Sequence, residues 1–291
     1  MRAWLGALSL LLLLAGPLGA AEGLDVWPPE LEQGQPLVAR ACLGQGVQGP
    51  GAELSLLGRR LPMVAGPGGC LVGMAGVDLD DKPGPVHLEV LSGDKVLLSR
   101  TLTVHARDYG TRKITVDGKF MELSPQNLAR YQEETARQKA VYASLLPRML
   151  WSGPWRPPLD SAVVGIFGRR SLVNGQPRSP HGGVDLRGAM GTPVLAPAAG
   201  RVALVLDTYF SGLTVLIDHG LGVVSGYRHF SKALVREGQM VRPGQVIGLV
   251  GMSGRVTGPH LHFDMHLAGA RVDPLAWIKA SAQLARWARQ P

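Results

Sequence analysis

Short alternating stretches of apolar and polar residues, separated by Gly, Pro and Asp, run through the first third of the chain. The stretches that this pattern predicts as strands are 37–42, 52–57, 86–90 and 97–104. Period-two alternation bounded by turn residues is typical of half-buried strands. Short strands at regular spacing predict a small immunoglobulin-like β-sandwich over residues 22–107.

A connector is predicted over residues 108–150. Residues 113–120 read as a hairpin with an Asp117-Gly118 turn, because Asp-Gly suits a two-residue hairpin loop. Ser124 followed by Pro125 predicts a helix start, which runs to about residue 146 and stops at Pro147. The apolar face of this helix, which we expect to pack on a neighbouring domain, consists of Leu128, Tyr131, Tyr142 and Leu145.

The last part of the chain is again rich in strand patterns, so the fold class is mainly β. Strands are predicted at 201–206, 213–218 and 245–250, within a domain that covers residues 151–276. Residues 277–291 read as a short basic helix packed outside any site in that domain.

Composition limits the partners. The 291 residues are enough for two modest domains, and 39 Gly and 22 Pro favour turns and short strands over long helices. A formal net charge of +8 favours anionic surroundings such as nucleic acid, anionic lipid or an acidic cell wall. The chain has no Lys/Arg-dense run with interleaved aromatics, which argues against nucleic acid.

The N-terminus has the layout of a secretory signal peptide over residues 1–21. A basic start at Arg2, an apolar run at 5–14 and small residues at Ala20 and Ala21 precede Glu22. The run is short for a membrane span, although a retained anchor is an alternative, and no Cys follows it for lipidation. We therefore expect an exported protein of the periplasm or cell envelope, with no stable membrane span after signal cleavage.

Cys42 and Cys70 are the two cysteines, and both fall in the N-terminal domain. In an exported protein a lone pair predicts one disulfide. Two buried thiols are the alternative. A two-cysteine zinc site is disfavoured because no histidine lies near either residue in the sequence.

Candidate chemistry is concentrated in the C-terminal domain. His181 and Asp185 form an H-x-x-x-D, and His260 and His262 form an H-x-H, with His229 between the two motifs. Two imidazoles and one carboxylate are a common ligand set for a catalytic zinc, with one position left open for water. Either motif alone occurs by chance; together in one exported β-rich domain they indicate a zinc hydrolase.

Strand alternation divides these residues by face. Over 260–267, His260, His262, Asp264 and His266 should point one way and the apolar residues the other. By the same logic Tyr227 and His229 should share a face. The Gly182-Gly183 pair is expected to let the backbone bend so that His181 and Asp185 reach one ion. His219 is expected to cap a turn, and His266 to be peripheral to the site.

Several longer motifs resemble the lysostaphin/LytM-type zinc endopeptidases over residues 160–275. The segments that carry this resemblance are 165–170, 175–185, 191–194, 217–220 and 254–263. The resemblance implies a compact antiparallel β domain with a zinc groove that cuts peptide cross-links of bacterial peptidoglycan. The upstream β region also resembles the N-terminal domain of some envelope members.

Residue roles follow from the motifs. The resemblance implies that His181, Asp185 and His262 hold Zn²⁺, and that His229 and His260 are the catalytic histidines. Phe230 replaces the family's Leu after His229, which changes packing and not chemistry. Tyr209 falls where some members place a tyrosine near the scissile carbonyl.

Other functions are kept as alternatives. The chain could be a non-catalytic LytM-type activator of an amidase, although such a protein is expected to lose zinc ligands, and all five core positions are present here. It could also be an enzyme held inactive until its N-terminal region is released, or a secreted protease for Gly-rich peptides. Expected partners are stem peptides and cross-bridges of peptidoglycan, with a regulatory protein as a further partner through the N-terminal domain.

Overall fold

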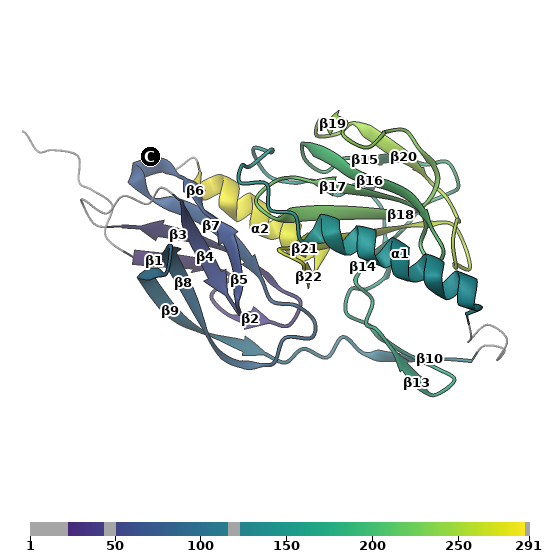
Figure 1. Cartoon of the computed structure of the whole chain (residues 1–291), viewed down its shortest axis with the longest axis horizontal. Coiled ribbons are helices and arrows are strands. Elements are labelled where there is room, and N and C mark those ends of the chain that lie inside the picture. Colours follow the sequence, from purple (N-terminus) through teal and green to yellow (C-terminus); the bar gives the residue numbers. More distant parts are fainter. Residues whose placement is uncertain (1–22, 44–50, 116–122, 289–291) are drawn as a thin grey trace, which may run out of the picture.

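The computed structural model describes residues 23–43, 51–115 and 123–288. The N-terminal part is a sandwich of two sheets (Figure 1). One sheet has the order β1-β3-β7-β6, with bounds Gly23–Trp27, Pro36–Cys42, Leu71–Gly76 and Val64–Ala65. The other has the order β2-β9-β8-β4-β5, with bounds Leu31–Glu32, Lys95–His105, Gly84–Ser92, Ala52–Leu56 and Arg59–Pro62. A 3₁₀ turn, η1 (Pro67–Gly69), precedes β7.

Alternation explains the sandwich. Ala52, Leu54 and Leu56 of β4 point inward and are buried, while Glu53 and Ser55 between them are partly exposed. Inward residues of both sheets form one apolar core. The four predicted strands of this region are confirmed as β3, β4, β8 and β9. The immunoglobulin-like character of the sandwich stays a prediction.

The predicted disulfide is confirmed. Cys42 at the end of β3 is bonded to Cys70 just before β7. It closes a loop with a sequence separation of 28 residues between strands that already pair in one sheet. The predicted signal peptide lies outside the described residues, and no helix among the described residues is long and apolar enough to cross a membrane.

The C-terminal part is built on one large sheet with the strand order β11-β14-β21-β18-β17-β16-β19, in which each strand runs antiparallel to its neighbours. Their bounds are Val163–Gly165, Gly183–Arg187, His260–Leu267, Val223–Ala233, Gly212–Asp218, Gly200–Thr208 and Met240–Val241. Three further strands pair with this path: β15 (Pro193–Leu195), β20 (Val246–Val250) and β22 (Ala270–Val272). The strands predicted here are confirmed as β16, β17 and β20.

The connector differs from its prediction. β10 (Thr111–Ile114) pairs in parallel with β12 (Arg170–Val173), so it joins the C-terminal domain's small sheet, whereas the Asp117-Gly118 turn lies outside the described residues. β12 continues into β13 (Gln176–Arg178) through Asn174-Gly175, both with positive φ. Asn-Gly is a strong sequence signal for a two-residue hairpin turn, although no hairpin is predicted at this position above.

Helix α1 (Pro125–Tyr142) begins as predicted, with the Ser124 hydroxyl accepting from the backbone N–H of Asn127 at 3.2 Å. The predicted apolar face is confirmed only in part: Tyr142 packs on the sheet, where its ring stacks on that of His266. Leu128 and Tyr131 are exposed, and the buried side chain of the helix is Glu134. The helix therefore packs on the sheet mainly through polar contacts.

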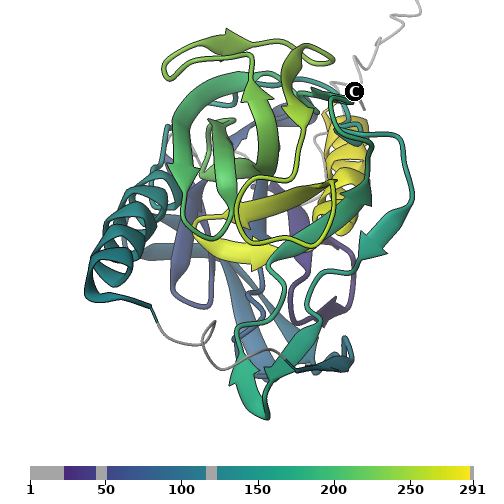
Figure 2. The same cartoon turned by 90° about the vertical axis from the view of Figure 1, so that its right-hand side faces the viewer.

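Helix α2 (Pro274–Trp287) follows the N-cap Asp273 and begins three residues before the predicted start at residue 277. It buries Trp277, Leu284 and Trp287. It lies between the sandwich and the C-terminal sheet (Figure 1). Viewed from the end opposite the sandwich, α1 and α2 lie on opposite flanks of that sheet (Figure 2). Apolar residues of the sandwich, α2 and the C-terminal sheet belong to one continuous core.

Candidate metal centre and catalytic cleft

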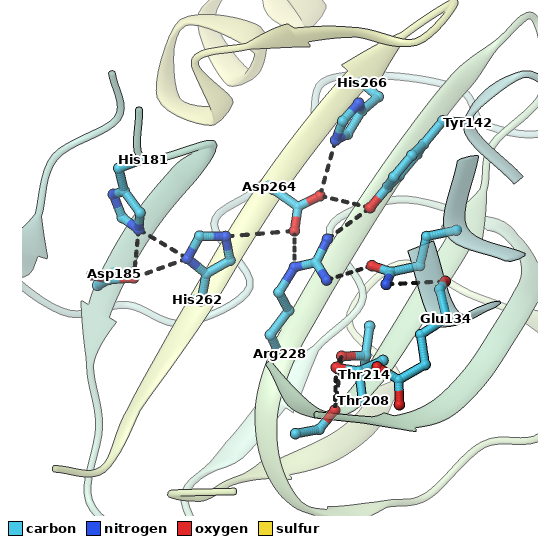
Figure 3. Close-up of polar contacts among 12 residues, drawn as sticks. Glu134, Tyr142, His181, Asp185, Thr208, Thr214, Arg228, His262, Asp264 and His266 are labelled. Carbon is cyan, nitrogen blue, oxygen red and sulfur yellow. Dashed lines mark hydrogen bonds and ion pairs between the residues drawn. The ribbon is translucent and has the colours of Figure 1, made fainter. Parts of the chain in front are cut away.

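Three predicted ligands converge. His181 Nε2 lies 3.0 Å from His262 Nδ1 and 3.1 Å from Asp185 Oδ1, and His262 Nδ1 lies 3.0 Å from the same Asp185 oxygen (Figure 3). Ligands around a tetrahedral zinc are expected about 3.3 Å apart, given bonds of about 2.0–2.1 Å. This trio of two imidazoles and a carboxylate therefore fits a divalent metal with little movement.

Strand pairing creates the trio. Asp185 on β14 lies opposite His262 on β21, so the antiparallel register places both side chains on one face. His181 reaches them from the turn before β14, where Ile166 O is 2.9 Å from its Nδ1. Nδ1 therefore carries a proton, and Nε2 is the nitrogen that would face a metal.

Two glycines make room for the trio, in a different way from the expected one. Gly183 is an extended residue of β14, and neither it nor Gly182 has a positive φ. A Cβ at Gly183 would lie 2.3 Å from Phe263 O, and one at Gly165 would lie 2.1 Å from an Asp185 carboxylate oxygen. The glycines are needed for close strand approach and not for a bend.

Asp185 and His262 are held in the ionisation states that a metal needs. Burial would raise the pKa of Asp185, but hydrogen bonds from His181 and His262 hold it well below its usual range. Burial lowers the pKa of His262, which favours its neutral form. An ionised carboxylate beside a neutral imidazole is the ligand chemistry that zinc prefers. Burial lowers the pKa of His181, but its contact with Asp185 outweighs burial and raises that pKa above its usual value, so a metal would displace a proton from His181 Nε2.

The alternation predicted for β21 is confirmed. Leu261, Phe263, Met265 and Leu267 are fully buried in the core, and the polar residues between them face the other way. His260 Nε2 lies 3.7 Å from Asp185 Oδ1, next to the trio but outside it. Gly258 O accepts from His260 Nδ1 at 2.9 Å, so Nε2 is the free lone pair.

The shared face predicted for Tyr227 and His229 is wrong. Tyr227 is buried against Phe263, and its hydroxyl pairs with Ser225. His229 has a left-handed φ of 64°, at a point where the register between β17 and β18 shifts. This β-bulge turns the His229 side chain to the cleft side of the sheet, where its ring lies 4.9 Å from that of His260.

His229 has the protonation state of a base. Burial lowers its pKa to about 4, so the ring is neutral at pH 7. Its Nδ1–H donates a hydrogen bond to the backbone carbonyl of Ser253 at 3.0 Å, which leaves the Nε2 lone pair free. His229 and His260 thus place two imidazole rings beside the trio, each with its Nδ1 bonded to a backbone carbonyl.

A polar network that was not predicted from the sequence contacts His262 at Nε2, the ring nitrogen that does not face Asp185. This nitrogen lies 3.6 Å from Asp264 Oδ2, and Arg228 Nε donates to the same oxygen at 2.8 Å. Tyr142 of α1 approaches both Asp264 and Arg228, and His266 stacks on Tyr142 with centroids 3.7 Å apart (Figure 3). His266, expected to be peripheral, therefore belongs to the network. The alternation of β21 could have identified Asp264, but only the register of β18 identifies Arg228.

The remaining expected residues lie elsewhere. His219 is fully buried, with its ring nitrogens 2.8 Å from Ala199 O and 2.7 Å from Ser225 Oγ, so it has a structural role. Tyr209 is not among the residues that line the cleft at the trio. Its hydroxyl accepts from Asn127 of α1 at 3.3 Å, and its backbone N–H donates to Glu134 at 2.9 Å. Its role near the scissile carbonyl stays a prediction.

The trio and both further histidines open into one cleft of about 960 Å³. One wall is the loop before β21. The other is the face of α1 that carries Tyr131, Gln138 and Lys139. A cleft of this size holds a peptide or a small ligand. A partly buried carboxylate-imidazole cluster beside two further imidazoles in such a cleft defines a candidate hydrolytic metal centre.

Comparison with known proteins agrees with this class. The model of peptidase family M23 matches residues 179–274, which contain the trio and both further histidines. A crystal structure from Pseudomonas aeruginosa, described as a candidate peptidase M23, superposes with a TM-score of 0.66 at 34% identity, covering 84% of this chain and 93% of that one. The chain belongs to peptidase family M23.

Two curated relatives are similar over shorter stretches. An uncharacterized metalloprotease of Haemophilus influenzae is 45% identical over 58% of this chain, and the peptidoglycan DD-endopeptidase ShyA of Vibrio cholerae is 42% identical over 41%. The matched regions span 37% and 29% of those relatives' own lengths.

Proposed function

We propose that this protein is a zinc-dependent endopeptidase that hydrolyses peptide cross-links of bacterial peptidoglycan outside the cytoplasm. The observation that carries the proposal is the trio, His181, Asp185 and His262, whose ligand atoms lie 3.0–3.1 Å apart in a cleft that also holds two free imidazoles. Family membership supports a peptidase, and the name of the Vibrio relative supports peptidoglycan as its substrate.

The chain's own groups supply proton transfer. Bound zinc would polarise the scissile carbonyl and make a water molecule more acidic. His229 Nε2, neutral because of burial, can accept the water proton. His260 Nε2, free because Nδ1 is engaged by Gly258 O, can accept the water proton in the same way, and whichever imidazole has accepted it then passes that proton to the leaving amine. The bulge at His229 fixes this geometry before substrate arrives.

Digestion of purified sacculi tests the proposal. The zinc-loaded full chain is expected to convert cross-linked muropeptide dimers to monomers, read by mass spectrometry. The matched control is His219→Gln, a buried histidine outside the cleft, which should retain activity at a permissive temperature, whereas His262→Ala should not. Intact dimers after digestion with zinc-loaded wild type would contradict the proposal and favour a binding role.

A second candidate is an endopeptidase restrained by α1. Three contacts of the helix favour it: Asn127 engages the Tyr209 hydroxyl, Glu134 engages the Tyr209 backbone, and Gln138 accepts from Arg228 at 2.7 Å. These contacts hold the helix as a cleft wall and keep Tyr209 from substrate.

Loosening the helix within the full chain separates the two candidates. Asn127→Ala combined with Gln138→Ala is expected to raise kcat/KM if α1 restrains the enzyme, because both contacts are lost without touching the trio. Gln132→Ala, on the exposed side of the helix, is the matched control. Equal kcat/KM for all three proteins would remove the second candidate.

A further inference from the structure

The cleft is strongly unbalanced in charge. Asp185 is the single acidic residue among those that line it, and it belongs to the trio. Five cationic side chains line the same cleft: Arg112, Lys139, Arg228, Arg255 and Arg271. Low-dielectric walls focus the field of such an excess, so the cleft attracts anionic ligands.

Two of the five cations are already neutralised by carboxylates. Arg228 pairs with Asp264 at 2.8 Å, and Arg271 pairs with Asp78 and Asp80. Among the ion pairs of the described residues, none joins Arg112, Lys139 or Arg255 to a carboxylate, and Arg112 donates through Nε to Ser171 Oγ at 3.0 Å. These guanidinium and ammonium groups have charge to offer to a ligand.

Arg255 is the best placed of these three because the structure holds its guanidinium group against an aromatic ring. Its backbone N–H donates to Phe210 O at 2.8 Å, and its guanidinium carbon lies 4.4 Å from the centre of the Phe210 ring. Phe210 in turn packs edge-on against Tyr131 of α1. A stacked guanidinium loses less entropy on binding than a free surface arginine.

The position of Arg255 along the chain ties it to the reacting groups. It lies in the loop that leads into His260, two residues after Ser253, whose carbonyl orients His229. A Cβ at the preceding Gly254 would lie 2.4 Å from Gly212 N, so loop and turn are in close contact. Arg255 and both imidazoles line one cleft, so a ligand group bound by Arg255 would lie in the cleft that holds them.

We propose that Arg255 binds a carboxylate of the substrate peptide next to the scissile bond, so that the enzyme selects cross-links bearing a free carboxylate over uncharged bridges such as oligoglycine. This inference rests on the endopeptidase function proposed above and names the substrate class of the same cleft. The planar guanidinium matches a carboxylate in a bidentate pair, whereas an amidated carboxyl offers one oxygen and no charge.

A matched pair of cross-linked peptides tests the inference, one with the carboxylate beside the scissile bond free and the other with it amidated. Zinc-loaded wild type is expected to cut the free form with a kcat/KM about 10- to 100-fold higher, as lost charge-assisted hydrogen bonds imply. Arg255→Gln should cut the two forms at similar rates. Arg236→Gln, an exposed arginine outside the cleft, is the control for charge and should keep the preference.

The outcomes separate the two proposals. Equal cutting of both peptides by wild type would overturn the role of Arg255 and leave the endopeptidase function standing. If Arg255→Gln loses activity on both peptides by the same factor with full zinc content, Arg255 is structural and the inference is also overturned. No cutting of either peptide by zinc-loaded wild type would overturn the proposed function and this inference together.

Discussion

The two β regions of this chain bury different chemistry. In the described part of the sandwich, no polar or charged residue is fully buried, and the core is aliphatic. The C-terminal sheet buries Asp218, His219, Ser225, His229, Asp264 and His266 among others. Buried polar groups cost stability unless they are paired. The sandwich core therefore contributes mainly stability, whereas the C-terminal sheet contains buried polar groups that cost stability and that form or surround a reactive site.

Removal of a trio residue should give the largest effect and affect one region alone. His262→Ala is expected to lower kcat/KM by at least about 10³-fold and to lose the metal, because it removes a ligand. Activity assays and metal analysis of the purified protein measure both losses. The variant should unfold in urea as wild type does in the presence of chelator; normal turnover with normal zinc would contradict the assignment.

His229→Ala sharpens the division within the site. Loss of a proton-transfer group is expected to lower kcat about 10²- to 10⁴-fold, while the metal stays because His229 is outside the trio. Activity measured beside zinc content distinguishes this variant from His262→Ala. Zinc loss in parallel with activity would move His229 into the ligand set.

Removal of the disulfide should have the opposite result: it should lower stability and leave activity unchanged. Cys42→Ala with Cys70→Ala opens a loop with a sequence separation of 28 residues and is expected to lower the free energy of unfolding by about 3–4 kcal/mol. Urea unfolding of the variant and of wild type measures the difference. Zinc content and kcat/KM at low temperature should not change. A large loss of activity in the folded variant would show that the sandwich shapes the cleft.

The pH dependence of stability should give the smallest effect, through His219. Burial lowers the pKa of His219 to about 4, from a reference value of 6.5 in the unfolded chain. Between these values the unfolded chain binds a proton that the folded protein does not, so stability falls as pH falls. The loss between pH 6.5 and pH 5 is roughly 2 kcal/mol.

Urea unfolding of wild type and His219→Gln at both pH values isolates this contribution. The other buried histidines are common to the two proteins and cancel in the difference. The same slope in both proteins would show that His219 is protonated without cost in the fold.

Local sequence patterns predicted most of the strands and the shared face of His260 and His262, but not the direction of the His229 side chain. Alternation along 260–267 correctly assigned His260 and His262 to one face, because a regular strand has a fixed period. It failed at His229, where a bulge inverts the side-chain direction. No sequence period encodes a bulge, since its position depends on which neighbouring strands pair.

Helix α1 shows the same limit for a helix. Its apolar residues were assigned to the packing face, but the surface it meets offers the Tyr209 backbone and Arg228, so Glu134 and Gln138 face inward. A helix that packs on a polar network has no apolar stripe to read. The partner surface, which is distant in sequence, determines the face.

The shared core described above joins the sandwich, α2 and the C-terminal sheet into one body. Arg271 of β22 also donates to Asp78 of the sandwich at 3.0 Å through Nε. An enzyme with a flexible tether can search a wide area around its anchor. Here the shared core and this ion pair hold the cleft at a constant distance and direction from the sandwich, so the cleft cannot be reoriented unless the sandwich moves with it.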